Sequence, residues 1–257
     1  MDMFHEVTDG VLVATSRRMS TTSTVMAAGG EAFLIDPAWL PDELDRLASS
    51  LDSAKLSVVG GFSTHAHHDH LLWHPAFGSA PRWASPLTAA LARSERASLV
   101  ESLGPDFPPS LVELMGRVEA TSGTIPHRCV PPGFHVELLV HDGHAPGHTA
   151  LWLPEQRVLV AGDMLSDIEV PLPFGPDDLP AYIEALDLLA GFARRAAVVI
   201  PGHGTPGTDA LARVDADRRF IDAVVDGREP DDERLANPGM LEALAHLREM
   251  VAEQPER

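Results

Sequence analysis

The run His65-Ala66-His67-His68-Asp69-His70 constrains this chain more than any other part of it. It directly follows the apolar segment Val58 to Phe62, so we expect it in a loop at the carboxyl end of a buried strand. Imidazole and carboxylate are the ligands that zinc prefers when thiolate is absent. The imidazole and carboxylate donors within these six residues are too many for one zinc ion that keeps an open position. The run therefore predicts two metal ions.

An isolated histidine-rich run is also typical of an exposed loop or an adventitious metal-binding tract. Three further residues favour a built site, because each lies beside a predicted strand, where loops carry functional side chains on a rigid scaffold. They are His148 in the turn before Ala150 to Leu153, Asp163 after Val158 to Gly162, and His203 after Val198 to Ile200. A single aspartate in a loop usually stabilises a turn or caps a helix, so neither Asp69 nor Asp163 would indicate a metal site by itself. The whole set of residues in this order does.

Short apolar runs and helical spacing divide the rest of the chain. We expect strands at 11–14, 24–27, 32–35, 58–62 and 198–200, and helices at 41–51, from Asp177-Asp178 onward and after Asn237-Pro238. Strands in two halves, each followed by helices, predict an α/β fold in which two sheets pack face to face with helices outside. We interpret the Pro- and Gly-broken helical segment at about 86–132 as a cap inserted into a single domain of residues 1–257, which ends in helices at about 209–254.

Composition excludes several classes of protein. The formal net charge is -19 and Lys55 is the only lysine, so the chain lacks the basic stripe that a nucleic-acid binder needs. Cys129 is the only cysteine, which rules out an intrachain disulfide and a cysteine-based zinc cluster. The first residues carry no basic or apolar leader, and no apolar run reaches the length of a membrane span of about 18 residues. We therefore expect a cytoplasmic protein with a small-molecule substrate and no membrane or nucleic-acid partner, and its Lys-poor, Ala/Arg/Pro-rich composition favours a bacterial source.

The ordered set resembles the metallo-β-lactamase superfamily, whose motif HxHxDH matches His65, His67, Asp69 and His70. The resemblance covers residues from about 10 to 205 and implies a four-layer αββα sandwich. It also implies the ligands: His65, His67 and His148 for one metal, Asp69, His70 and His203 for the other, and Asp163 bridging both. Asp36 in Leu34-Ile35-Asp36-Pro37 matches the early aspartate of the family, which supports the metal loop without binding metal.

This resemblance implies a hydrolase with two zinc ions, with iron or manganese as alternatives. Metal binding lowers the pKa of water from 15.7 toward about 7, so a metal-bridging hydroxide could attack a lactone, ester or thioester carbonyl, with Asp69 and Asp163 as the catalytic carboxylates. The true β-lactamases carry Cys or Ser near the position of Asp163, so the chain is nearer the glyoxalase II and lactonase-type branches. A phosphodiesterase or nuclease is disfavoured by charge. An iron-dependent oxidoreductase is disfavoured by the intact ligand set, as is a non-enzymatic binding role.

The remaining candidates have two interpretations each. His68 occupies the variable position of the motif and is expected to be a bystander, whereas His144 is either a turn residue or a residue that orients a ligand. Trp73 and the loop 164–174 could line a substrate pocket or pack in the core. The apolar face of the cap could meet an apolar substrate or pack on the domain; it consists of Leu111, Val112, Leu114 and Met115. The histidines without a motif are expected to be structural or solvent-facing: His5, His74, His127, His135, His141 and His246.

Overall fold

Two β-sheets lie face to face in the computed structural model, which describes residues 3–37, 39–121, 123–173 and 178–253. The seven-stranded sheet runs β1 (His5–Thr8), β2 (Val11–Thr15), β3 (Thr22–Ala28), β4 (Glu31–Ile35), β5 (Ser57–Phe62), β6 (Arg82–Ala84) and β7 (Glu119–Ala120). The four-stranded sheet runs β11 (Val198–Pro201), β10 (Val158–Gly162), β9 (Thr149–Leu153) and β8 (Glu137–Val140). Strands β1 to β4 are antiparallel neighbours, whereas β4 to β7 are parallel and need crossovers between them.

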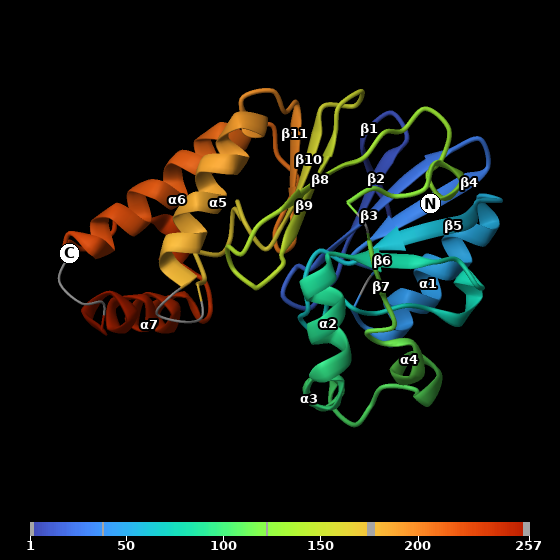
Figure 1. Ribbon diagram of the computed structural model, residues 1–257, viewed down its shortest axis with the longest axis horizontal. Helices are drawn as coiled ribbons and strands as arrows, with labels where there is room; N and C mark the ends of the chain where they lie inside the picture. Colours follow the sequence, from blue (N-terminus) through green and yellow to red (C-terminus); the bar gives the residue numbers. More distant parts are fainter. Residues whose placement is uncertain (1–2, 38, 122, 174–177, 254–257) are drawn as a thin grey trace.

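Helices cover the outer faces of both sheets (Figure 1). On the side of the seven-stranded sheet lie α1 (Pro41–Ser53), α2 (Pro86–Ser94), α3 (Arg96–Leu103) and α4 (Pro109–Leu114). On the side of the four-stranded sheet lie α5 (Asp178–Ala193), α6 (Ala210–Val225) and α7 (Met240–Glu253). The predicted αββα order of layers is therefore confirmed. Among the described residues, no helix is both long and apolar enough to cross a membrane.

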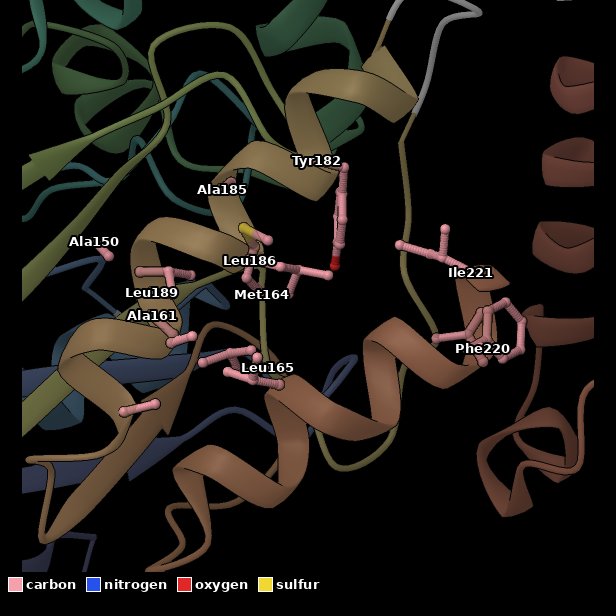
Figure 2. Packing of buried hydrophobic residues seen from close by; sticks show 14 of the residues in the cluster. Ala150, Ala161, Met164, Leu165, Tyr182, Ala185, Leu186, Leu189, Phe220 and Ile221 are labelled. Atoms are coloured by element: carbon pink, nitrogen blue, oxygen red, sulfur yellow. The ribbon is translucent and has the colours of Figure 1, made fainter. Parts of the chain in front are cut away.

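Alternation along the strands explains the layers. In β4, Phe33 and Ile35 join the cluster between the sheets, whereas Ala32 and Leu34 pack outward against Leu47 of α1. On the far side, Figure 2 shows Leu186 and Leu189 of α5 packing beside Leu165, with Phe220 of α6 in the same cluster. Both faces of each central strand are thus buried, as the near-continuous apolar runs predict.

The segment 86–132 packs on the domain. Met115 is fully buried and Leu111 is nearly so, in a cluster with Trp39 and Leu71. Gly116 donates its backbone N–H to the carbonyl of Leu71. This hydrogen bond connects the end of α4 to the residue that follows the metal-motif loop (65–70). The hypothesis that this face meets a substrate is therefore wrong for Leu111 and Met115, and Val112 and Leu114 also pack on core clusters. The end of the segment belongs to the sandwich itself, through β7 and through Cys129 and Val130 between the sheets.

Trp73 and part of the loop 164–174 are also core. Trp73 is 2% exposed and packs on Phe77 and beneath the guanidinium of Arg82. Met164, Leu165 and Val170 are buried beneath the helices of the four-stranded sheet, and Phe174 lies outside the described residues. These side chains fix the loop after β10 to the helical layer.

Candidate metal centre

Four segments converge at one end of the sheets. They are the loop after β5 with the histidine motif, the turn before β9, and the segments that follow β10 and β11. Each buried strand ends at a fixed place in its sheet, so the first polar side chains beyond it are held there. Two groups of side chains result, each with its donor atoms within 4.8 Å of one another: His65, His67, His144 and Asp163, and then Asp69, His70 and His203.

Asp163 lies between the two groups. Its Oδ2 atom is 3.4 Å from Nε2 of His65 and 3.2 Å from Nε2 of His203, and its Oδ1 atom is 3.2 Å from Nε2 of His70. The buried Oδ1 atom has no partner with hydrogen-bond geometry among the described residues. A buried carboxylate oxygen without a hydrogen bond is costly unless a cation sits against it, so this position fits a bridging metal ligand.

The turn before β9 differs from the sequence prediction. Nε2 of His144 faces the first group, 3.3 Å from Asp163 Oδ2, whereas His148 lies in neither group. Nε2 of His148 instead accepts the backbone N–H of Asp163 at 3.0 Å. Its Nδ1 atom lies 3.2 Å from Nε2 of His141. His141, which was expected to be structural or solvent-facing, stacks on the ring of His148. The only sequence signal for this contact is the number of histidines around the turn.

Oxygen acceptors fix the orientation of the other rings. Carboxylate and carbonyl oxygens can only accept, so the ring nitrogen that faces one must carry the proton. The Nδ1 atoms concerned belong to His70 beside Asp36 at 3.0 Å, His203 beside the Met19 carbonyl at 2.9 Å, and His144 beside the Leu172 carbonyl at 3.1 Å. In each neutral ring the Nε2 lone pair then faces the centre, which is the arrangement of a metal-binding imidazole.

The buried carboxylates of the centre need positive charge close to them. Burial would raise the pKa of Asp163, but His70, His203 and His65 hold it well below its usual range. Burial would lower the pKa of His203, but Asp163 and Asp69 raise it to about 11. Divalent cations would supply this charge and displace the protons. The donor set, its orientation and its charge therefore all fit divalent metal ions.

Comparison with known proteins agrees with this geometry. The family model for the Metallo-beta-lactamase superfamily matches residues 17–203. The chain belongs to the metallo-beta-lactamase superfamily. It is 31% identical over 140 residues to the "Probable metallo-hydrolase YflN" of Bacillus subtilis (strain 168), a match that spans 47% of this chain and 49% of that protein. The chain thus aligns with about half of the length of this relative.

Solved structures share the metallo-beta-lactamase fold. A metallo-beta-lactamase family protein from Thermus thermophilus is 20% identical with a TM-score of 0.67, covering 95% of this chain and 93% of its own. A beta-lactamase domain protein from Burkholderia ambifaria is 17% identical with a TM-score of 0.68, covering 97% of this chain and 86% of its own. At such identities the likeness establishes the fold.

Asp36 and His68 lie beside the metal groups without belonging to either of them. Asp36 accepts the backbone N–H of Thr64 at 2.8 Å and its hydroxyl at 2.6 Å, besides the contact with His70. It therefore binds the motif loop and faces no metal group. His68 lies outside both groups, with its ring 5.0 Å from that of Trp39 and its Nδ1 atom 3.7 Å from Oδ1 of Asp69.

Two buried arginines that no sequence motif marks hold the loops of the candidate metal centre. Arg234, in the 3-10 helix η3 (Glu233–Ala236), donates from Nη1 to the carbonyls of Ser166 at 3.1 Å and Glu169 at 2.9 Å. Arg213 of α6 donates from Nη1 to the carbonyls of Leu165 at 3.2 Å and Thr205 at 3.1 Å. The helical layer thereby ties the loop after Asp163 to the loop after His203. No local motif marks these residues, because an arginine in such a helix normally faces solvent.

Proposed function

We propose that this protein is a binuclear metal-dependent hydrolase that attacks carbonyl substrates of the lactone, ester or thioester class, with zinc as the preferred metal. One observation carries the proposal: the Asp163 carboxylate contacts imidazoles of both groups, as a bridging ligand requires. A charge of -19 favours a small substrate over a nucleic acid.

Under this proposal there are two ion positions. His65 and His67, with an imidazole from the 144–148 turn, would hold the first ion, and Asp69, His70 and His203 would hold the second. Cys129 is buried between the sheets, so no thiolate competes. Imidazole and carboxylate donors in these numbers suit zinc and also admit iron or manganese. When bound, such ions acidify water and polarise a carbonyl oxygen.

The chain supplies orientation and charge for this reaction. The oxygen acceptors behind His70, His203 and His144 keep each Nε2 lone pair directed at the centre. The carboxylates of Asp69 and Asp163, 4% and 5% exposed, would offset the charge of the ions and receive the proton lost by the attacking water. Removing either carboxylate should therefore affect turnover more than folding.

Metal analysis combined with a substrate panel tests the proposal. We expect about two metal ions per chain and hydrolysis of lactones, aryl esters or thioesters in preference to β-lactams and phosphodiesters. Asp163→Ala should lose most turnover and metal, whereas the matched variant His68→Ala should keep both, because His68 lies outside the groups. One metal per chain in zinc-replete protein, iron with oxygen consumption, or a preference for phosphodiesters would contradict the proposal.

A further inference from the structure

The loop between β2 and β3 forms one wall of the metal centre. The carbonyl of Met19 accepts from Nδ1 of His203, and the hydroxyl of Thr21 lies 3.4 Å from Oδ2 of Asp69. Met19 and Ser20 have φ values of 54° and 52°, in the left-handed region, so the chain turns sharply here. This turn holds Arg17 and Arg18 at the rim of the second metal group.

The two neighbouring arginines have different partners. Arg17 is neutralised: its guanidinium donates to both carboxylate oxygens of Asp42, at 2.7 and 2.8 Å, and lies 3.3 Å from Glu43. The guanidinium carbon of Arg18 lies 4.8 Å from the centroid of the Trp39 ring. Among the described residues, no carboxylate forms an ion pair with Arg18 within 4.0 Å. Arg18 is thus an exposed, uncompensated cation in a chain with twice as many acidic as basic residues.

Trp39 connects this cation to the metal-motif loop. The Trp39 ring is 3% exposed and meets the ring of His68, the neighbour of Asp69, at 5.0 Å in an edge-to-face contact. Stacking on an aromatic ring uses the face of a guanidinium and leaves its N–H groups at the edge free to donate. Those donors form a fork that matches a carboxylate. The structure therefore presents an unused anion-binding group beside the centre.

We infer that Arg18 is a specificity-determining residue, which binds a carboxylate carried by the acyl substrate of this enzyme. The inference rests on the proposed hydrolase function and narrows its substrate class to anionic acyl compounds. Arg18 is separated from Asp69 by Trp39 and His68, so the carboxylate would lie several bonds from the carbonyl that is attacked. The rest of the acidic protein surface would repel an anionic substrate. The positive charge of Arg18 beside the metal centre would therefore determine how the substrate is oriented.

Two esters of matched size test the inference with the metal-loaded protein. One is the p-nitrophenyl monoester of glutarate, which has a free carboxylate, and the other is its methyl-capped neutral form. We expect Arg18→Gln to lower kcat/KM for the anionic ester about tenfold or more, mainly through KM, and to leave the neutral ester within about twofold. Arg18→Lys should recover part of the loss, because it keeps the charge but not the fork.

Arg17→Gln is the matched control, since that neighbouring guanidinium is occupied by Asp42. Equal losses on both esters in Arg18→Gln, or the same loss in Arg17→Gln, would overturn the inference while leaving the hydrolase proposal intact. Failure of the wild-type protein to hydrolyse either ester would count against the hydrolase proposal instead. Calorimetric titration with glutarate tests Arg18 without turnover: binding about tenfold weaker in Arg18→Gln but not in Arg17→Gln is expected, and equal binding in all three proteins would refute the inference.

Discussion

Asp36 holds the ring of His70 from behind, with 3.0 Å between its Oδ2 atom and Nδ1 of the imidazole. The same oxygen accepts the hydroxyl of Thr64, so one carboxylate fixes the motif loop and the tautomer of a metal-facing ring. In Asp36→Asn an amide N–H₂ would face these donors. We expect metal affinity to fall about 10- to 100-fold, measured by competition with a chelator.

Asp45→Asn is the control for that variant. Asp45 makes a similar contact with His74, 3.0 Å from Oδ1 to Nε2, but on the exposed surface of α1. Its replacement should leave metal affinity unchanged. Similar losses in both variants would mean that Asp36 has no special role at the centre.

Gly202 leaves room for the Asp163 carboxylate. A Cβ atom at Gly202 would overlap Oδ1 of Asp163 and come within 3.0 Å of the backbone of Gly162. Gly202→Ala should therefore displace the bridging carboxylate and reduce metal content and turnover. Gly191→Ala, where a Cβ meets no atom within 4 Å inside α5, should keep the metals and raise stability by about 0.5 to 1 kcal/mol in urea unfolding. Full metal content in Gly202→Ala would contradict the assigned position of Asp163.

His144 and His148 stand at the two ends of one turn, and variants can separate their roles. We expect His144→Ala and His148→Ala each to lower metal content, because His144 faces the first group and His148 holds the backbone of Asp163. His141→Ala should weaken metal binding about tenfold by releasing the His148 ring. The exposed His135 supplies the control variant, His135→Ala, which should bind metal normally. Metal loss confined to His144→Ala would show that His148 neither binds metal nor is needed to hold Asp163.

Local patterns are enough to predict the strands and most of the centre. The apolar runs at 32–35 and 58–62 form β4 and β5. A strand that is buried on both faces has a continuous apolar sequence, and such a run can be recognised without knowing the rest of the fold. The motif residues His65, His67, Asp69 and His70 adjoin a strand end, so their proximity follows from the chain itself. Asp163 and His203 come close to each other because β10 pairs with β11. The family resemblance predicts this long-range pairing, whereas the spacing of the residues along the chain does not.

Long-range packing explains the rest. An apolar face on a short helix has the same sequence pattern whether it contacts a ligand or the core. Met115 packs in the core because the hydrogen bond from Gly116 to Leu71 holds this segment against the domain. Arg213 and Arg234 are missed for the converse reason, since their role depends on carbonyls far away in sequence. Which of His144 and His148 faces the centre depends on the conformation of a single turn, including a φ of 69° at His144.

Arg234 forms a buried ion pair that also holds the loop after Asp163. Its Nη1 atom lies 2.6 Å from Oδ1 of Asp217, and both side chains are almost fully buried. Arg234→Met would leave Asp217 buried without its partner, which should cost about 3 to 5 kcal/mol in urea unfolding, with some loss of metal. Arg248→Met removes an exposed pair with Glu229 and should cost at most about 1 kcal/mol. Equal costs would show that burial of the Arg234 pair contributes nothing.

The same pair gives stability a pH dependence that can be isolated. Burial raises the pKa of Asp217 from 3.8 to about 6, and the opposing effect of Arg234 is smaller. Because the folded state holds this proton more tightly than the unfolded state, the contribution is fully present below pH 3.8 and is lost as the pH rises through about 6. Between pH 7 and pH 5 the wild-type protein should therefore gain roughly 1 to 2 kcal/mol relative to Asp217→Asn, whose amide does not titrate. Urea unfolding of both proteins at the two pH values gives this difference and cancels the titration of the shared histidines. A difference that stays constant, or that favours the wild type at the higher pH, would show that Arg234 keeps Asp217 ionised and that its pKa is not raised.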